Sequence, residues 1–380
     1  LGQAFNIHYK FKEAIEAYTL FLETASTKNK KLYKKQALKG IAESEVGIEL
    51  TKITVADDVQ NLGNEINSAF GDYSPVISSK GDSLFFTSRR RYSNTDQLFD
   101  SVDFQYFENV YTAVSDRENM QWKDLKILSG LTDQKNHNAV IFKNDIAEIH
   151  YRSINNGDLF IKYGKKEPVP FPESINTEFS ETSAVLSSDG NTLYFVSNRK
   201  KDNFGGKDIY YSLKDDAGNW GDAVNIGNVI NSEYDEDGLF LHPKDFAMFF
   251  GSKGPGSMGG YDIFKTEKSD SGWSKPKNVG YPVNTPANDI HFRISPSCKR
   301  IFFASDRSGG FGMQDLYMCT LTNKICFRLS MEGTVKSADD DTPLEAFVQV
   351  FDKNDVEIFS RRTDSEKGEY IGFIPSGDDY

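Results

Sequence analysis

The sequence has few cysteines, no long apolar run and no excess of basic residues. Its three cysteines, Cys298, Cys319 and Cys326, are too few and too unevenly spaced for a disulfide framework or a zinc site. We expect buried thiols, with a Cys319–Cys326 disulfide as the alternative in an oxidising compartment. No run of about 18 apolar residues occurs, so we expect no transmembrane segment. The net charge of −12 argues against nucleic acid as a partner.

Common signatures of a catalytic or metal site are also missing. The sequence contains no G-x-S-x-G nucleophile elbow, and its five histidines show no metal-ligand spacing. The acidic runs 235–237 and 339–341 lack an EF-hand frame, so solvated loops are expected there, with structural calcium as the alternative. We therefore predict no catalytic, cofactor-binding or metal-binding residues.

Aromatic residues, in contrast, are plentiful and lie in short runs. They make up 13% of the chain, which favours β structure. Residues 181–227 contain four strand-like runs, SAVLS, TLYFVS, DIYYSL and AVNIG, separated by turns rich in Gly, Asn and Asp. Four strands in about 50 residues are typical of a β-propeller blade.

The same frame recurs along the chain. Its anchors are Asn67, Asn176, Asn231 and Asn284, which lie 109, 55 and 53 residues apart. The first spacing is about twice the others, and a degenerate copy fills it: AEIHYRS (147–153) replaces the aromatic strand. We predict five blades between residues 52 and 327, with six as the alternative because 89–110 has room for an extra hairpin.

A strand that has no blade of its own precedes the first copy. It reads VADDVQNLG (55–63), and the last copy lacks such a strand. We expect it to complete the last blade and to close the ring, because closure removes unpaired strand edges.

Several polar and aromatic residues recur at one position in each copy: Asp158, Asp208, Asp262 and Asp315 at the start of the third strand, and Trp122, Trp220 and Trp273 before the closing strand. Recurrence indicates architecture, because a catalytic site needs one geometry rather than five. We expect the aspartates to accept hydrogen bonds at strand starts. Features peculiar to this protein are expected where the copies differ: at 89–110, in the second blade and in the glycine-rich loop 251–260.

The two ends of the chain differ from the repeat. Residues 1 to about 50 carry apolar residues at three- and four-residue steps, with a break at 27–30, which predicts two or more helices. After residue 327, strict alternation in AFVQVFD and EYIGFIP predicts an antiparallel sandwich. The sandwich is incomplete and the chain begins inside a helical pattern at Leu1, so we expect a processed or partial chain.

Three stretches resemble known families. The region 67–327 resembles TolB-type (WD40-like) propeller repeats, best in Ser-x-Asp-Gly, Ser-x-Arg and Gly-Gly-x-Asp-Ile-Tyr within 187–211. The segment 332–380, with E-G-T-V, P-L-E-A-F-V-Q-V-F-D and I-P-S-G, resembles a transthyretin-type carboxypeptidase regulatory-like domain. F-N-I-H-Y-K-F-K-E-A-I-E-A-Y near the start resembles a tetratricopeptide (TPR) hairpin.

That order of modules resembles the OmpA-family, PorE-like outer-membrane-associated proteins of Bacteroidetes, some of which act in type IX secretion or gliding. The resemblance implies a periplasmic protein at the outer membrane, with protein partners in the cell envelope. It also implies attachment to peptidoglycan through a C-terminal domain outside this sequence.

We thus predict a mainly β chain with three parts: a TPR-like helical segment (1–51), the propeller (52–327) and a truncated regulatory-like sandwich (328–380). The leading hypothesis is a non-catalytic scaffold without cofactors. The alternative is a glycan- or peptide-binding propeller, with hydrolysis included. The feature that would favour the alternative is convergence of acidic and aromatic side chains from several blades.

Overall fold

The computed structural model describes residues 1–380 apart from 92–98, 116–120, 129–134, 155, 245, 270–271, 297, 322–327, 352–356 and 376–380. The chain divides into two compact units, residues 1–321 and 322–380, which are described separately. None of the described helices combines the length and the apolar character needed to cross a membrane.

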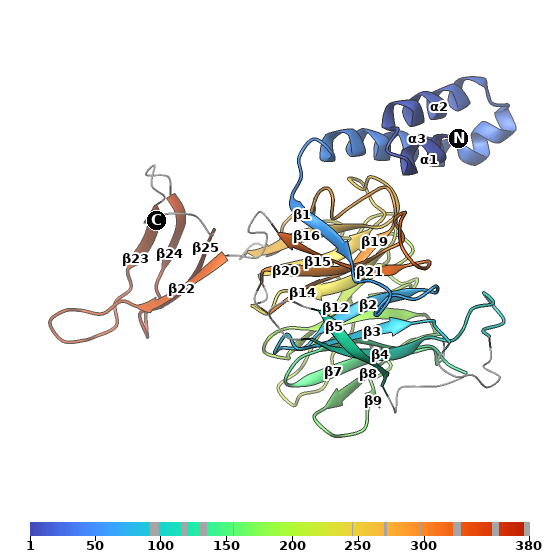
Figure 1. The fold of residues 1–380 in the computed structure, drawn as a ribbon. Coiled ribbons are helices and arrows are strands. Elements are labelled where there is room, and N and C mark those ends of the chain that lie inside the picture. Colours follow the sequence, from blue (N-terminus) through green and yellow to red (C-terminus); the bar gives the residue numbers. More distant parts are fainter. Residues whose placement is uncertain are drawn as a thin grey trace. The chain divides into compact units, whose positions relative to one another are not determined.

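Five small antiparallel sheets follow one another along the first unit and form the blades of a β-propeller (Figure 1). From the inner strand outward, blade 1 consists of β2 (Asp72–Ile77), β3 (Ser83–Ser88), β4 (Asn109–Ser115) and β5 (Trp122–Ile127). Blade 2 consists of β6 (Asn138–Lys143), β7 (Ala147–Arg152), β8 (Asp158–Tyr163) and β9 (Val169–Pro170). Blade 3 is β10 (Glu181–Leu186), β11 (Thr192–Ser197), β12 (Asp208–Leu213), β13 (Val224–Asn225). Blade 4 consists of β14 (Glu236–Leu241), β15 (Ala247–Ser252) and β16 (Asp262–Ser269), and both β17 (Gly272–Trp273) and β18 (Lys277–Asn278) pair with β16. Blade 5 consists of β19 (Asp289–Ile294), β20 (Arg300–Ser305), β21 (Asp315–Leu321) and β1 (Ala56–Asn61).

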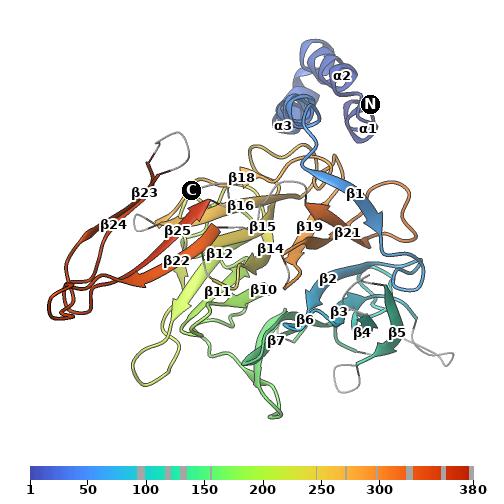
Figure 2. The same cartoon turned by 60° about the vertical axis from the view of Figure 1, so that its left-hand side comes forward.

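The ring closes at five blades. The inner strands β2, β6, β10, β14 and β19 pack against one another in this order, and β19 packs against β2. This arrangement decides against the six-bladed alternative. Strand β1 pairs with β21 as the outer strand of blade 5, and the blue and orange strands lie side by side in Figures 1 and 2. The predicted closing strand is confirmed.

Every inner strand carries a β-bulge near its first residues. In each blade the pairing register between the inner and the second strand shifts once. The shift lies between residues 73 and 76 in blade 1, 140 and 142 in blade 2, 181 and 183 in blade 3, 237 and 240 in blade 4, and 290 and 293 in blade 5. Ser74 and His291 take φ values of 53° and 61°, in the left-handed region that non-glycine residues seldom adopt. Bulges redirect neighbouring side chains. They therefore set the side-chain directions at this end of the ring.

The core of the propeller lies between neighbouring blades. Buried side chains of blades 2 and 3, such as Leu159 and Phe195, belong to one cluster, and blades 3 and 4 share another. Each recurring tryptophan packs on an aromatic ring of the preceding blade, with ring centroids 5.8–6.0 Å apart: Trp122 on Phe302, Trp220 on Phe171 and Trp273 on Tyr194. These contacts join the blades.

Three helices precede the propeller: α1 (Gly2–Ile7), α2 (Phe11–Thr24) and α3 (Thr27–Leu50). Helices α2 and α3 approach closely at Gly40, where a Cβ atom would lie 2.3 Å from the Tyr18 ring. The predicted break at 27–30 is wrong, because α3 begins there. Ser26 Oγ accepts a hydrogen bond from the Asn29 amide (3.4 Å) and caps the helix. The TPR assignment itself is not shown and stays a prediction.

The second unit contains two strand pairs. Strand β22 (Arg328–Thr334) pairs with β25 (Glu369–Pro375), and β23 (Phe347–Phe351) pairs with β24 (Glu357–Arg362). The alternating runs AFVQVFD and EYIGFIP thus contribute strands, as expected. A transthyretin-like sandwich is not confirmed by these pairs and stays a prediction.

The cysteines were expected to be buried thiols. Cys319 is buried, Cys298 is half-buried, and neither forms a disulfide with a described residue. Burial raises the pKa of the Cys319 thiol to about 12. Cys326 lies outside the described residues, so its pairing with Cys319 is not decided.

Candidate functional site

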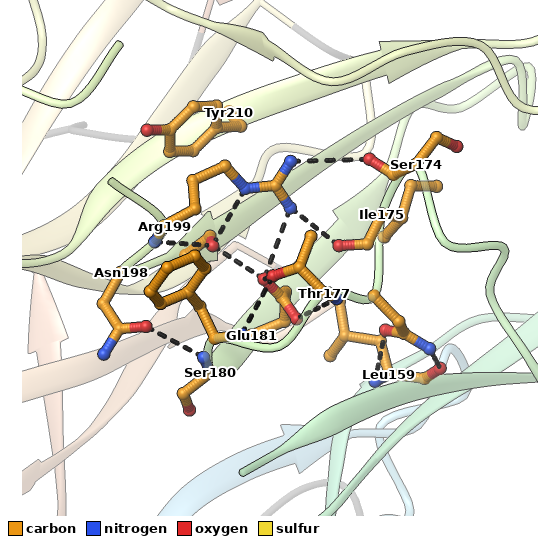
Figure 3. A network of polar contacts seen from close by, with 12 residues as sticks. Leu159, Ser174, Ile175, Thr177, Ser180, Glu181, Asn198, Arg199 and Tyr210 are labelled. Atoms are coloured by element: carbon orange, nitrogen blue, oxygen red, sulfur yellow. Dashed lines mark hydrogen bonds and ion pairs between the residues drawn. The ribbon is translucent and has the colours of Figure 1, made fainter. Parts of the chain in front are cut away.

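A buried carboxylate begins the inner strand in four of the five blades: Asp72, Glu181, Glu236 and Asp289. Figure 3 shows the arrangement around Glu181, whose Oε1 atom accepts hydrogen bonds from Thr177 Oγ1 (2.9 Å) and Ser197 Oγ (2.7 Å). Arg199 Nη2 lies 3.3 Å from the same oxygen and donates to the Ile175 carbonyl (2.7 Å). Equivalent ion pairs join Arg90 to Asp72 and Arg307 to Asp289, both at 2.6 Å. The recurrence identifies these carboxylates as part of the blade architecture.

Blade 4 lacks this arginine. Glu236 accepts hydrogen bonds from Ser232 Oγ (2.7 Å) and Ser252 Oγ (2.8 Å), but Gly254 stands where blades 1, 3 and 5 have arginine. Burial raises the pKa of Glu236 to about 7.

The recurring aspartates hold the loops that precede the third strands. Asp208 accepts hydrogen bonds from the backbone amides of Phe204 (2.7 Å) and Gly205 (3.1 Å) and from Asn225 Nδ2 (2.8 Å). Asp262 is bonded in the same way by Met258 N and Asn278 Nδ2, and Asp315 by Phe311 N, Gly312 N and Asn61 Nδ2. Asp158 is buried at the start of β8. Each of these four residues begins the third strand of its own blade, and the hydrogen-bonded ones hold a loop there, so the structure does not join them into one site.

The four anchor asparagines have one function in common. Each uses its side-chain oxygen to accept the backbone N–H of the second residue of a third strand, at 2.8–2.9 Å: Asn67 from Leu316, Asn176 from Leu159, Asn231 from Ile209 and Asn284 from Ile263. The landmarks that reveal the repeat therefore fix backbone geometry.

Residues beside these repeated positions differ from blade to blade, and they meet at one end of the propeller axis, where the inner strands begin. We call them the axial cluster: Tyr73, Glu108, Tyr151, Thr182, Lys207, Asp237, Tyr261 and His291. Together they come from all five blades. Three of them, Glu108, Lys207 and Tyr261, directly precede the first residue of a third strand.

Asp237 is the most strongly held carboxylate of the axial cluster. It is only 7% exposed and accepts hydrogen bonds from Lys207 Nζ (2.7 Å), Thr182 Oγ1 (3.0 Å) and the Gly238 amide (2.8 Å). Burial acts to raise the pKa of Asp237, but the Lys207 charge and hydrogen bond outweigh burial and lower it. At neutral pH the site contains an ionised carboxylate.

Glu108 is the second carboxylate, and it belongs to blade 1. The Tyr73 hydroxyl donates to Glu108 Oε1, and His137 Nδ1 lies 3.6 Å from Oε2. The Tyr73 ring stacks on His291, with centroids 6.1 Å apart. Blades 1 and 5 are thereby linked at the axis.

Tyr151 lies within electrostatic reach of both carboxylates. Burial raises the pKa of Tyr151, and the charges of Glu108 and Asp237 raise it further. Burial likewise raises the pKa of Tyr261, with Asp237 adding to the effect. For His291, burial lowers the pKa to about 4 despite the nearby Asp237. At neutral pH the tyrosines are protonated donors and His291 is uncharged.

The axial cluster is not sealed from solvent. The side chains of Glu108 and Lys207 are 18% and 30% exposed, and Tyr73, Tyr151, Tyr261 and His291 are partly exposed. A ligand at the end of the axis therefore has access to carboxylate acceptors, hydroxyl and ammonium donors, and aromatic rings. This set of groups suits a molecule rich in hydroxyls.

Sequence reasoning did not find these residues, although it pointed to the segments that hold several of them. Glu108 lies in 89–110, Tyr151 in the second blade, and Tyr261 directly after the loop 251–260. The signal was present: the position before the third strand reads Glu108, Gly157, Lys207, Tyr261 and Gln314 in the five copies. Three of these five residues belong to the axial cluster, but the variation by itself does not show that they face one axis.

The acidic run 235–237 is not the solvated loop that was predicted. Glu236 and Asp237 are buried, and Asp235 is paired with Lys253 at 2.9 Å. Among the described residues, no group of three or more His, Cys, Asp or Glu side chains is placed to hold a metal ion. Structural calcium remains an untested alternative.

No protein-family model matches the chain, and no curated protein does either. Solved structures match it at low identity. A structure described as a complex of BT0996 with RGII has a TM-score of 0.46 and 9% identity, covering 73% of this chain and 95% of that one. The structure of a putative TolB from Agrobacterium tumefaciens has a TM-score of 0.37 and 13% identity, covering 80% of this chain and 91% of that one. The catalytic domain of the Coprinopsis cinerea GH62 α-L-arabinofuranosidase has a TM-score of 0.42 and 10% identity, covering 71% of this chain and 98% of that one.

These likenesses concern the fold alone. Other structures that match are described as a glycoside hydrolase and as β-xylosidases. The prediction that the chain is not an enzyme is overturned by this finding, because solved proteins with this fold include hydrolases. What the comparisons show is a five-bladed propeller with a TolB-like structural neighbour.

Proposed function

We propose that this chain binds a carbohydrate at the axial cluster. The observation that supports the proposal is the convergence of acidic and aromatic side chains from all five blades. This convergence is the feature that separates a ligand-binding propeller from a scaffold whose polar residues serve each blade alone.

The charge states of the axial cluster fit a neutral sugar. Asp237 is ionised and accepts hydrogen bonds, Lys207 donates them, and the protonated tyrosines do both. Burial acts to lower the pKa of Lys207, but the charge and hydrogen bond of Asp237, together with the charges of Asp235 and Glu108, outweigh burial and raise it. The aromatic rings offer apolar faces beside these polar groups, as carbohydrate rings require.

Hydrolysis of a glycosidic bond is the reaction that two carboxylates on separate blades can support. Asp237, held ionised by Lys207, suits the role of base or nucleophile. Glu108, which accepts the Tyr73 hydroxyl as a carboxylate, is the candidate for the second role: it takes up a proton from solvent and passes it to the leaving-group oxygen. Water adds across the bond, and no cofactor is needed.

A glycan array probed with the labelled 380-residue chain tests binding. We expect signals on a related group of neutral glycans and loss of these signals in Asp237→Asn. Asp216→Asn, which removes an exposed carboxylate from the turn between β12 and β13, is the matched control. An array without signal, or equal loss in both variants, would sink the proposal.

Hydrolysis is tested separately. Glycans that bind are incubated with the wild type and with Glu108→Gln, and new reducing ends are measured. We expect release by the wild type and at least a hundredfold slower release by the variant. Binding without release would leave a glycan-binding protein and remove the hydrolytic part.

The periplasmic location at the outer membrane, the envelope partners and the peptidoglycan link remain proposals. They are supported only by the order of TPR-like, propeller and regulatory-like segments. Fractionation of cells that produce the full-length protein tests them, and recovery in the cytoplasm would contradict them.

A further inference from the structure

A cavity of about 490 Å³ lies at the other end of the propeller axis, where the inner strands finish. Every blade contributes to its apolar wall, through Ile77, Phe142, Leu186, Leu241 and Ile294 among others. The volume falls within the range of small-molecule sites, which are roughly 300–1,000 Å³. We call this space the basal cavity. It shares no residue with the axial cluster.

Arg293 lies in the lining of the basal cavity. Its side chain is 6% exposed, and its guanidinium donates to the carbonyl oxygens of Phe292 (2.7 Å), Ile141 (2.8 Å) and Leu239 (3.0 Å). These carbonyls belong to three blades and bear no formal charge. Within the described part of the chain, Arg293 forms no ion pair with a carboxylate. A buried cation without a counter-charge is costly, and an anion would offset that cost.

His242 supplies a second buried donor in the wall of the basal cavity. It is 6% exposed, and its Nδ1 atom accepts the backbone N–H of Lys244 at 3.2 Å. The proton of the neutral ring therefore lies on Nε2. Nε2 is buried and has no hydrogen-bond partner among the described residues. Buried donors are normally satisfied, so this one points to a missing acceptor.

The rim adds further positive charge. Lys143 and Lys244 line the basal cavity together with one carboxylate, Asp145, which accepts a hydrogen bond from Ser79 Oγ at 2.5 Å. Lys143 also pairs with Glu148 outside the lining. Counting Arg293 with the two lysines against Asp145, the lining residues carry a net charge of +2 (3 − 1).

We propose that the basal cavity binds a small organic carboxylate with an apolar tail. The carboxylate accepts hydrogen bonds from Arg293 and His242 Nε2, because these are the buried donors that lack an anionic partner. The tail packs on Phe142, Leu186 and Leu241. The proposal does not depend on carbohydrate binding at the axial cluster.

Calorimetric titration of the 380-residue chain with hexanoate, hexanamide and inorganic phosphate at pH 7 tests the proposal. We expect hexanoate to bind at least tenfold more tightly than hexanamide, which lacks the charge, and than phosphate, which lacks the tail. Equal affinity for hexanoate and hexanamide, or no binding of hexanoate, would overturn it. If phosphate binds as tightly as hexanoate, the apolar tail contributes nothing to binding, and the proposed packing of the tail is wrong.

Variants locate the bound hexanoate. Arg293→Met keeps the length of the side chain and removes its charge, and we expect affinity to fall more than tenfold. His242→Phe, which keeps a ring in the wall, is expected to lower affinity about fivefold and serves if Arg293→Met does not fold. Lys275→Met, at the exposed outer edge of blade 4, is the charge-matched control. Unchanged affinity in folded His242→Phe contradicts the proposal.

Discussion

Glu181 and Glu236 occupy the same position in neighbouring blades, yet only Glu181 faces an arginine. Both side chains are fully buried and bonded to two hydroxyls. The difference lies in one residue, Arg199 in blade 3 and Gly254 in blade 4. Without the guanidinium, burial raises the pKa of Glu236 to about 7. Burial raises the pKa of Glu181 as well, but there the Arg199 charge acts against burial.

The stability of the fold should depend on pH through Glu236. An unfolded glutamate titrates near 4.5 and folded Glu236 near 7, so between these values only the folded chain holds the proton. The free energy of unfolding therefore falls as pH rises through this window, by about 3 kcal/mol for this group. Urea denaturation at pH 5 and pH 8 should show this fall in the wild type relative to Glu236→Gln. An unchanged difference between the two proteins would refute the prediction.

Removing the guanidinium from blade 3 should be strongly destabilising. Arg199→Met leaves Glu181 buried without its cation, which is expected to lower the free energy of unfolding by about 3–5 kcal/mol. Lys200→Met changes an exposed neighbour and should alter it by less than about 0.5 kcal/mol. Chemical denaturation of both variants at pH 7 measures the contrast, and similar values for the two would argue against a structural clamp.

At the scale of elements, the sequence was most informative where residues fix the backbone. Asn231 and Asp208 each accept hydrogen bonds from backbone amides of blade 3. Other blades need the same hydrogen bonds, so the same residue types recur in them. That repetition made five blades and the closing strand predictable. The start of α3 at Thr27 was not predicted, because a single capping residue, Ser26, is only a weak signal of a helix start in the sequence.

The axial cluster was not predictable in the same way. Tyr73, Glu108 and Asp237 are far apart in the sequence, and each blade contributes a different residue type. A single sequence shows repetition but does not show which differing positions face one axis. The bulge at the start of each inner strand, which decides these directions, has no marker common to all five blades.

Ring closure by β1 gives a prediction for this element. Deleting residues 1–63 removes the outer strand of blade 5 and exposes the edge of β21, so the propeller should unfold with lower cooperativity and aggregate. Deleting residues 1–50 keeps β1 and is the control. Calorimetry and size-exclusion chromatography distinguish the two. A monomeric, cooperatively unfolding 64–380 chain would contradict the role assigned to β1.

For the whole molecule, the ring has two chemically different ends. The axial cluster combines two carboxylates, a lysine and three tyrosines, whereas the basal cavity is apolar with buried cationic donors. Arg293 and His291 lie two residues apart on β19 and belong to opposite ends. The two sites can therefore be tested by separate variants of one chain.

Carbohydrate binding at the axial cluster is the central claim, and calorimetric titration of a glycan selected on the array tests it most directly. We expect one site per chain in the wild type. Asp237→Asn and Tyr151→Ala should each weaken binding by at least tenfold, because each removes one contact at the axis. Asp216→Asn should bind as the wild type does. Unaltered affinity in folded Asp237→Asn and Tyr151→Ala, or no heat of binding with any glycan, would contradict the account.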